Sequence, residues 1–319
     1  MKKYIIWTLV LIVLISYLIL RNVITLYRPK QPLKNKEILQ IEYTDRNKKN
    51  VIIKKEDNNW YVITANGKYK ADVEKIKSLI DKLNKFELLE LVSRKNDNYQ
   101  EYDLSEDKAV KVKLSLKQKP LNFVIWLGKT GGFTYDEVYA RINNKPEVYI
   151  TRNLSKYEFQ NNFYDFCDRT ILKFSSEETN YVIARINNKN LEFKKELKDG
   201  TTVWFNVKTG KKLDITKIDN LLKNYSELIS DIILEQNECD ISKIKILTEL
   251  KLYFADGTEI MLNLYDKITL ATESSPVHPV KIKILTTKGA AIKSIGEEEY
   301  IYGLYEYRYK NIVDELTSL

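Results

Sequence analysis

Length, composition and charge narrow the class of protein to which this chain can belong. It has 319 residues, of which 44% are hydrophobic and 30% are charged, and its formal net charge is +8. This length is enough for two domains with cores of their own, and this composition excludes an intrinsically disordered chain. The basic residues are spread along the sequence, which favours a solvated basic surface over a nucleic-acid or anionic-membrane interface. We therefore expect no nucleic-acid partner.

The rare residues exclude several kinds of chemistry. His278 is the only histidine, so a histidine-rich metal site and any mechanism that needs two histidines are excluded. Cys167 and Cys239 are the only cysteines, and their spacing is not that of a metal site. A disulfide between them would join the two halves of the chain. Two buried thiols are favoured, and the sequence leaves the bridge open.

The N-terminal region predicts a membrane anchor. Residues 5–20 carry no charge, and twelve of these sixteen residues are Ile, Leu or Val. Each of them favours membrane insertion by about 0.3–0.6 kcal/mol near the centre of a helix. Sixteen residues are fewer than the roughly 20 that cross a bilayer, but the helix can continue if Arg21 snorkels to the interface. We predict an uncleaved transmembrane signal anchor over residues 4–26 and a juxtamembrane linker over residues 27–37, in preference to a buried core helix.

The charges that flank this segment leave its orientation open. Two lysines precede it, and five basic residues follow it between positions 21 and 36. The positive-inside rule would then keep the body of the protein in the cytoplasm. A short positive tail before an apolar core is, however, the usual layout of an export signal, and large domains cross the membrane largely regardless of charge.

One α+β pattern occurs twice along the chain. In its first copy a strand-like segment at 60–63 precedes a helix that begins after Asp72 and has apolar residues at helical spacing. A shift of 142 positions places Asp214 on Asp72, each as an N-cap, and aligns the apolar faces of two helices. The aligned apolar residues are Val73, Ile76, Leu79, Ile80, Leu83 and Phe86 in the first copy and Ile215, Ile218, Leu221, Leu222, Tyr225 and Leu228 in the second.

The order of the other segments extends this repeat to two units, residues 38–175 and 176–319. Asn153 is expected to cap a closing helix in the first unit, a terminal helix closes the second, and residues 274–279 are expected to form an extra loop. The predicted fold class is α+β: two tandem repeats of a mixed or antiparallel sheet with packed helices, preceded by one N-terminal transmembrane helix. Strand patterns fall at 51–53, 60–63, 88–92, 110–114, 121–127, 138–140 and 148–150, and again at 191–193, 203–207, 232–234, 250–254, 260–262 and 300–302.

Three segments carry residues that ligand-binding or reactive sites use, and each has a simpler explanation. Gly128-Lys129-Thr130-Gly131-Gly132 is glycine-rich, but it lacks the ending of a phosphate loop and no helix follows it, so a strand-to-strand turn is favoured. Glu297-Glu298-Glu299 offers carboxylates to a hard cation without further oxygen ligands at loop spacing, so a solvated charge run is favoured. His278 has no serine or cysteine nucleophile near it in sequence, so a loop histidine is favoured.

Paired residues also have two interpretations. Asp72 and Asp214 suit a pair of acids, yet helix capping explains both. Trp60 and Trp204 suit stacking on a sugar or a base, but packing of each on its own helix is favoured. Half-buried positions explain most of a tyrosine cluster that offers an interaction rim: Tyr300, Tyr302, Tyr305, Tyr307 and Tyr309. We therefore assign no catalytic, cofactor-binding or metal-binding residue, and we expect no cofactor and no enzymatic activity.

A series of short motifs occurs in a recognisable order over residues 50–235. They are the Trp60 strand followed by Ala71-Asp72, then Tyr102-Asp103-Leu104, Leu127-Gly128, Val148-Tyr149, and Asp168-Arg169 with Leu172 and Phe174. In this order the chain resembles a bacterial family, the domain of unknown function 4340 (DUF4340). Proteins of that family often have Tyr-Gly-Leu where this chain has Tyr102-Asp103-Leu104.

The resemblance implies a location and no chemistry. Proteins similar to this family are typically anchored by one N-terminal helix with the body outside the cytoplasmic membrane, and are often associated with transporter components of the kind linked to gliding motility. The family has no established activity, so no site residue is implied. On this basis we expect a single-pass protein of the cell membrane whose C-terminal bulk is extracytoplasmic.

Three functions from different classes follow. We favour a membrane-tethered extracytoplasmic binding or assembly module, non-enzymatic and accessory to an ABC-type transporter complex. Its expected partners are the cytoplasmic membrane and ABC-type transporter subunits or other envelope proteins. The alternative is an envelope polysaccharide- or peptidoglycan-binding module that uses Trp and Tyr platforms. An enzyme that works through carboxylates such as Glu297 or Asp214 would need these groups to converge in one cleft.

Overall fold

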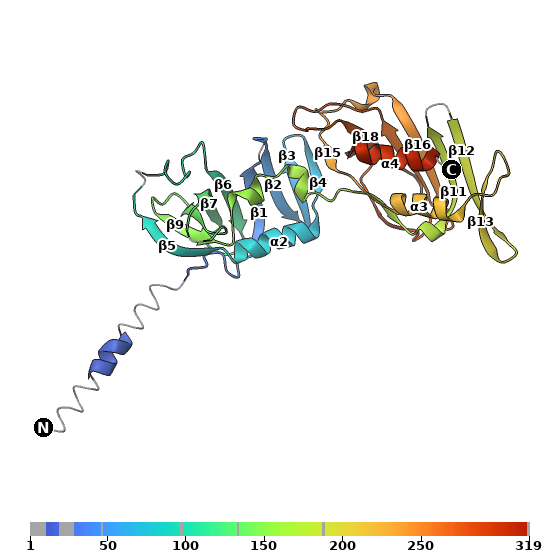
Figure 1. The fold of residues 1–319 in the computed structure, drawn as a ribbon. Coiled ribbons are helices and arrows are strands. Elements are labelled where there is room, and N and C mark those ends of the chain that lie inside the picture. Colours follow the sequence, from blue (N-terminus) through green and yellow to red (C-terminus); the bar gives the residue numbers. More distant parts are fainter. Residues whose placement is uncertain are drawn as a thin grey trace. The chain divides into compact units, whose positions relative to one another are not determined.

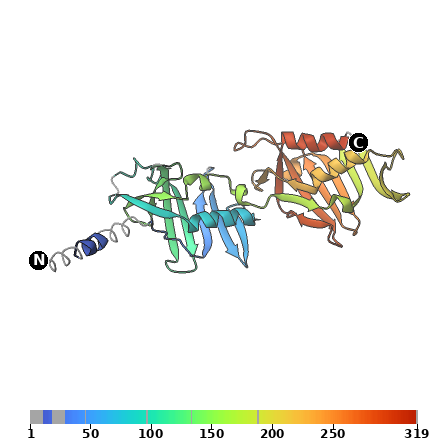
Figure 2. The same cartoon turned by 60° about the horizontal axis from the view of Figure 1, so that its bottom comes forward.

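The chain folds into two compact units (Figure 1). The computed structural model describes residues 11–18, 29–45, 47–95, 98–132, 134–186 and 189–317. The first unit comprises Met1–Ala65 and Lys70–Phe166, and the second comprises Asn66–Tyr69 and Cys167–Leu319. Each unit consists mainly of β-sheet with helices along it (Figure 2).

The first unit supplies eight strands of a nine-stranded, mostly antiparallel sheet, and the ninth, β4, belongs to the segment Asn66–Tyr69 apart from Lys70. The spatial order of this sheet is β4-β3-β2-β1-β6-β7-β8-β9-β5, so the first strand lies in its middle. Ile41 of that strand pairs with Ile53 on one side and with Leu114 on the other. The strands are β1 (Ile38–Thr44), β2 (Asn50–Glu56), β3 (Asn59–Thr64), β4 (Gly67–Lys70), β5 (Glu87–Ser93), β6 (Val110–Leu116), β7 (Asn122–Thr130), β8 (Val138–Ile142) and β9 (Val148–Arg152).

The helix of the first unit forms where its sequence predicts it. In α2 (Val73–Asn84) the buried residues Ile76, Leu79 and Leu83 recur at helical spacing. Burial of each such side chain contributes about 1.5–3 kcal/mol. The Asp72 side chain accepts hydrogen bonds from two backbone N–H groups of the first turn, at 3.1 and 3.2 Å, which confirms its role as the N-cap.

The second unit contains an eight-stranded sheet and a three-stranded sheet. The spatial orders are β13-β12-β11-β16-β17-β18-β20-β15 and β14-β10-β19. Two α-helices accompany them, α3 (Ile215–Ser226) and α4 (Glu306–Thr317). The strands are β10 (Thr170–Phe174), β11 (Thr179–Ile186), β12 (Lys189–Lys198), β13 (Thr201–Asn206), β14 (Glu227–Ile229), β15 (Ile232–Leu234), β16 (Ile246–Phe254), β17 (Glu259–Tyr265), β18 (Val277–Thr286), β19 (Ile292–Ile295) and β20 (Ile301–Tyr305).

The two large sheets have matching strand orders. Without β4, the first sheet runs β3-β2-β1-β6-β7-β8-β9-β5, and the second runs β13-β12-β11-β16-β17-β18-β20-β15. In both sheets, three strands form a meander (β1-β2-β3 and β11-β12-β13) that a helix follows in the chain. A later strand, β5 or β15, pairs at the opposite edge of the sheet. The first strand of each meander, β1 or β11, pairs with β6 or β16. The prediction of an α+β fold with mixed or antiparallel sheets is confirmed, because the sheets are mostly antiparallel and a few helices accompany them.

The predicted helix after Asn153 is wrong. Asn153 adopts a positive φ of 73°, and its side chain donates a hydrogen bond to the Lys85 carbonyl oxygen instead of capping a helix. Two single-turn 3₁₀ helices follow, η1 (Lys156–Phe159) and η2 (Phe163–Phe166). The first begins at Ser155, whose capping box with Glu158 satisfies the backbone of only one turn. Two further 3₁₀ helices lie in the second unit, η3 (Ser176–Glu178) and η4 (Ile241–Lys243).

The predicted loop over residues 274–279 is wrong in its second half, because β18 begins at Val277. Pro279 lies within this strand, opposite Gly303 of β20. A Cβ on Gly303 would come within 2.6 Å of Val277 and 2.7 Å of Ile232. The absence of a side chain at Gly303 therefore allows the strands to pack closely beside a proline that ordinarily argues against a central strand.

Most of the predicted membrane anchor, residues 4–26, lies outside the described residues. Residues 11–18 are helical and all of their side chains are exposed. Within the described ranges, no helix is both long and apolar enough to cross a membrane.

Candidate functional site

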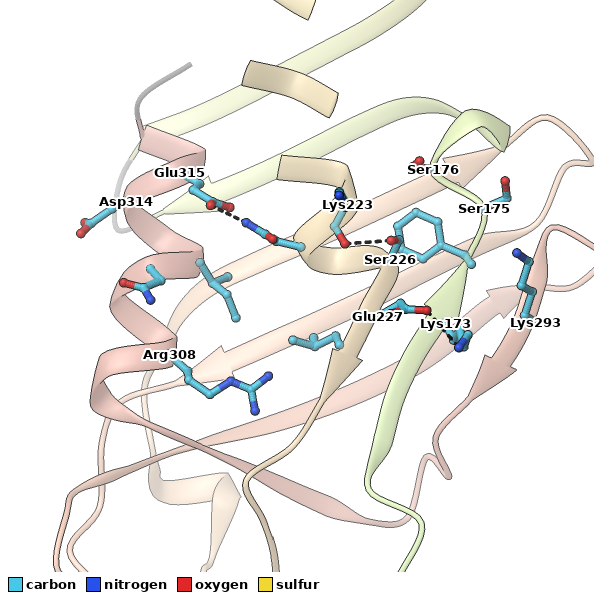
Figure 3. Close-up of a pocket in the computed structure, with 15 residues that line it drawn as sticks. Lys173, Ser175, Ser176, Lys223, Ser226, Glu227, Lys293, Arg308, Asp314 and Glu315 are labelled. Carbon is cyan, nitrogen blue, oxygen red and sulfur yellow. Dashed lines mark hydrogen bonds and ion pairs between the residues drawn. The ribbon is translucent and has the colours of Figure 1, made fainter. Parts of the chain in front are cut away.

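The second unit contains a cleft of about 940 Å³ between two helices and the small sheet (Figure 3). The strands β10, β14 and β19 supply one side of it, and α3 and α4 supply the other. We call it the α3–α4 cleft. Its lining residues are Lys173, Phe174, Ser175, Ser176, Lys223, Asn224, Ser226, Glu227, Leu228, Lys293, Arg308, Asn311, Ile312, Asp314 and Glu315.

The amphipathic pattern of α3 determines which side chains reach the cleft. Ile218, Leu221 and Leu222 are buried in the core, which leaves Lys223 and Asn224 to line the cavity. Tyr225 is buried too, and its hydroxyl lies 3.5 Å from the backbone oxygen of Ile312 on α4. Burial raises the pKa of this phenol well above its usual value, so the hydroxyl remains a neutral donor between the two helices.

The strand side of the cleft contains a cross-strand ion pair. Lys173 of β10 and Glu227 of β14 are directly opposite each other in the register, and Lys173 Nζ lies 3.0 Å from Glu227 Oε1. This hydrogen bond from Lys173 holds the pKa of the Glu227 carboxyl below its usual value. Because both side chains are largely exposed, the pair adds little to stability. Its groups remain available to a ligand.

A more buried ion pair fixes the arginine of the cleft. Arg308 Nη1 lies 2.9 Å from the Asp231 carboxylate, whose side chain is only 11% exposed. The other oxygen of Asp231 accepts a hydrogen bond from the backbone N–H of Tyr305 at 2.9 Å. The guanidinium is therefore held in place by the protein and is neutralised by its own chain.

Two lysines of the cleft have no such partner. Lys223 of α3 and Lys293 of β19 line the cavity, and neither ammonium group is within 4.0 Å of a carboxylate in the part of the chain that the structure describes. Asn224 donates a hydrogen bond to Glu315. In Figure 3, Asp314 and Glu315 lie on one side of the cleft, while Lys173 and Lys293 lie on the other. The cleft can therefore bind charged ligands through groups that its own fold leaves available.

The glycine-rich segment predicted as a turn is mostly strand. Residues 128–130 belong to β7, and only Gly131 and Gly132 enter the turn. A Cβ on Gly128 would lie 2.1 Å from the Tyr102 carbonyl oxygen and 3.1 Å from the Leu104 side chain. The same Tyr102 carbonyl accepts a hydrogen bond from the backbone N–H of Lys129 at 3.1 Å. Gly128 is thus required for the close packing of a loop on the strand.

His278 is not the loop histidine that the sequence favoured. It lies in β18 and is 2% exposed. Its Nδ1 is 2.9 Å from the Tyr265 carbonyl oxygen, and its Nε2 is 3.0 Å from the Glu306 carboxylate. The ring is stacked on Tyr309, with centroids 3.7 Å apart and an interplanar angle of 10°. These contacts are all with residues of the same unit, and two of them are with α4, so His278 links β18 to α4.

The paired residues occupy structural positions. Asp214 accepts a hydrogen bond from the backbone N–H of Thr216 at 2.9 Å, so it caps α3 as predicted. Trp204 is 2% exposed and offers no stacking surface, whereas Trp60 is half-buried. Cys167 and Cys239 are buried and are not bridged to each other.

The C-terminal acidic and tyrosine clusters are also used within the second unit. The Glu298 carboxylate accepts a hydrogen bond from the Ile284 backbone N–H at 2.6 Å. Tyr302 is buried and accepts a hydrogen bond from the Glu297 backbone N–H, while Tyr307 is 61% exposed. Among the described residues, no group of three or more His, Cys, Asp or Glu side chains is arranged to hold a metal ion.

Sequence reasoning did not identify the residues of the α3–α4 cleft. Its basic residues come from four elements that are far apart in the chain: Lys173, Lys223, Lys293 and Arg308. None of them belongs to a motif with a recognisable spacing. The internal repeat relates the helices beside the two cavities, but it does not indicate a cavity, which becomes visible beside the repeated helix of the first unit only in the structure.

Fold and cleft together define a sheet-rich α+β protein of two units with a charged cleft. The model of a family described as Domain of unknown function (DUF4340) matches residues 60–245, which is more than half of the chain. The chain belongs to this family. No curated protein matches it, and no solved structure does.

Two of the motifs by which the chain resembles this family meet in the structure. Leu104 is fully buried, and it packs with the Tyr102 carbonyl over Gly128. Asp103 has a φ of +55°, a left-handed conformation that glycine adopts without strain. This backbone geometry explains why a glycine suits the middle of the Tyr102-Asp103-Leu104 motif. These two motifs therefore have a structural role, the packing of a loop against a strand.

Proposed function

We propose that this chain is a membrane-tethered, extracytoplasmic binding or assembly module, non-enzymatic and accessory to an ABC-type transporter complex. The observation that carries the proposal is the α3–α4 cleft, which is open and is lined by charged side chains from five separate elements. A cleft of this size and polarity suits recognition of a polar partner. The family resemblance supports an extracytoplasmic location for the body of the chain and its association with a transporter.

The binding role is tested by affinity purification of the full chain from detergent-solubilised membranes. The expected result is recovery of transporter subunits in a constant ratio to the chain after size-exclusion chromatography. A monodisperse chain that elutes without a partner contradicts the proposal. Co-sedimentation with cell-wall sacculi would instead favour the polysaccharide- or peptidoglycan-binding alternative, for which buried Trp204 provides no platform.

The proposed tether is the apolar segment over residues 4–26. Its support is the absence of charge over residues 5–20, together with the helical, exposed side chains of residues 11–18. Alkaline carbonate extraction should leave the full chain in the membrane pellet and release a variant that lacks residues 1–28. Protease added to spheroplasts should degrade the body of the full chain. Extraction of the full chain into the supernatant, or protection from the protease, contradicts the corresponding part of the proposal.

We also propose that the two units are tandem copies of one α+β unit. The support is the matching order of eight strands in the two large sheets, with α2 and α3 at the same place in each order. An experimentally determined structure provides the test. The eight strands and the helix of one unit should superimpose on those of the other with the same sequence direction, and a failure of any central strand to align contradicts a duplication.

A further inference from the structure

The α3–α4 cleft has a counterpart in the first unit, which reveals what is particular to the cleft. A cavity of about 380 Å³ lies along α2 and is bordered by residues of η1 and η2. α2 and α3 follow the third strand in the two matching strand orders, whereas η1–η2 and α4 follow the last strand. Both cavities therefore lie between the repeated helix and the segment that closes the unit.

In the first unit the side chains of this cavity bind each other. Lys82 Nζ of α2 lies 3.0 Å from the Glu158 carboxylate of η1, which joins the two borders of the cavity. Lys75 donates a hydrogen bond to the backbone oxygen of Asp165 at 2.7 Å, and its ammonium group also lies 3.9 Å from the Asp72 carboxylate. The two lysines that line this cavity are thus engaged within the unit.

In the second unit the equivalent side chains have different partners. The shift of 142 that relates the helices places Lys82 on Asn224, and a shift of 150 that relates the closing segments places Glu158 on Arg308. Asn224 bonds Glu315, and Arg308 bonds Asp231 outside the cavity lining. The Lys82–Glu158 ion pair that joins the two borders of the first cavity therefore has no equivalent at these positions of the second unit. The cavity of the second unit is more than twice as large as that of the first.

We propose that the α3–α4 cleft binds an acidic segment of a partner polypeptide, an inference that rests on the binding function proposed above. Among the described residues, neither Lys223 nor Lys293 forms an ion pair within 4.0 Å, although Lys293 is near enough to Glu227 to help lower the pKa of that carboxyl, and the two lysines come from different elements on the same cavity. Carboxylates are the natural partners of such groups. Asn311, Ser175 and Ser176 add side chains that both donate and accept hydrogen bonds, which suits the N–H and C=O groups of a peptide backbone.

The lining of the cleft favours a polypeptide over other anions. Arginine forks and helix N-termini give a bound phosphate a fixed geometry, whereas lysine binds phosphate and carboxylate alike as a point charge. Here the guanidinium of Arg308 is engaged by Asp231, and the N-terminus of α3 is capped by Asp214, which does not line the cleft. A sugar acid would gain from an aromatic platform, but Phe174, the aromatic residue of the lining, is only 3% exposed.

The charges also give the cleft a direction. Asp314 and Glu315 lie at the α4 side, and they would repel the carboxylates of a ligand. The acidic residues of the bound segment therefore lie away from Asp314 and Glu315, against Lys223 and Lys293.

Fluorescence anisotropy of labelled octaglutamate, added to the full chain in neutral detergent, tests the inference. The test variant is Lys223→Glu/Lys293→Glu. The matched control is Lys208→Glu/Lys211→Glu, which changes the net charge equally at exposed positions outside the cleft. Octaglutamate should bind the unaltered chain and the control with similar affinity, and should bind the test variant roughly tenfold or more weakly.

Three results would overturn the inference: no binding of octaglutamate, equal binding of octaglutamine, or equal losses in the two variants. Tighter binding of an octagalacturonate would also overturn it, because the carboxylates would then be recognised on a saccharide. The purification described above separates this inference from the proposed function. If the unaltered chain and the test variant recover transporter subunits equally, the function stands and the cleft assignment fails. If octaglutamate binding depends on the cleft but no partner is recovered, the assembly role fails alone.

Discussion

The contacts of His278 lead to a quantitative prediction for His278→Phe. Phenylalanine can retain the volume of the ring and its stacking on Tyr309, so the substitution mainly removes two hydrogen bonds. The Tyr265 carbonyl only accepts hydrogen bonds, so Nδ1 must donate to it. The second bond joins Nε2 to the Glu306 carboxylate at 3.0 Å.

The expected loss of stability is about 2–4 kcal/mol. The Tyr265 carbonyl, at a part-buried contact, loses its donor, which costs about 1–3 kcal/mol. The loss at Glu306 is smaller, about 1 kcal/mol, because its side chain is 27% exposed and retains Lys310 at 3.2 Å. With a urea dependence of about 2 kcal/mol per molar, the unfolding midpoint of the second unit should decrease by about 1–2 M.

Urea unfolding of the full chain in neutral detergent, followed by circular dichroism and by hydrogen exchange of peptides from β18 and α4, measures this loss. Tyr307→Ala is the control on the same helix, because Tyr307 is 61% exposed and its replacement should change stability little. If His278→Phe remains within about 0.5 kcal/mol of the unaltered chain, its two hydrogen bonds do not stabilise the unit, and this reasoning is refuted.

Three further predictions follow from single contacts. Asp214→Ala should destabilise the second unit by about 1 kcal/mol through loss of the N-cap of α3, and an unchanged urea midpoint would contradict the capping role. Gly128→Ala should reduce the free energy of unfolding by several kcal/mol, roughly as much as other overpacked sites, because its Cβ would lie 2.1 Å from the Tyr102 carbonyl oxygen. An unchanged thermal unfolding temperature would show that the loop can move away without cost. The hydrogen bond with His278 holds the pKa of Glu306 below its ordinary 4.5, so this pair stabilises the fold above that pH and its contribution is lost as the pH falls through the lowered pKa. Glu306→Gln should therefore be less stable than the unaltered chain at pH 7 and should lack this part of the acid dependence, which unfolding curves between pH 3 and pH 7 measure; parallel pH profiles would argue against it.

Local sequence signals predicted the helices and most strands but misplaced segments that tertiary contacts determine. Asp72 and Asp214 each precede an apolar face of helical period, so cap and periodicity agreed with the structure. Pro279 led to a wrong prediction because the rule against proline in strands considers only the local sequence. The space for this proline is provided by Gly303, which lies opposite it and comes from another part of the chain. Asn153 misled because it resembles a helix cap, although its side chain is bound to a carbonyl of a distant segment.

The candidate site was less predictable than the fold for the same reason. Lys223 and Lys293 become neighbours of one cavity only after β19 joins β10 and α4 packs beside α3. No short-range pattern links them, and a lysine that lines a cleft has the same local sequence as one on a solvated surface. Only the comparison of the two units distinguishes them, because it reveals the ion pair of Lys82 that the second unit lacks.

The central position of β1 and β11 has a consequence for the order in which the chain can fold during synthesis. Ile41 cannot pair with Leu114 until β6 has been synthesised, and Val182 cannot pair with Leu252 until β16 has been synthesised. The middle of each sheet therefore forms only after these later strands are available. β5 leaves the ribosome well before β9, the strand that it pairs with at the edge of the sheet. A nascent chain that stops short of β9 therefore presents an unpaired leucine-rich strand, the kind of segment that holding chaperones recognise and that aggregates when they are absent.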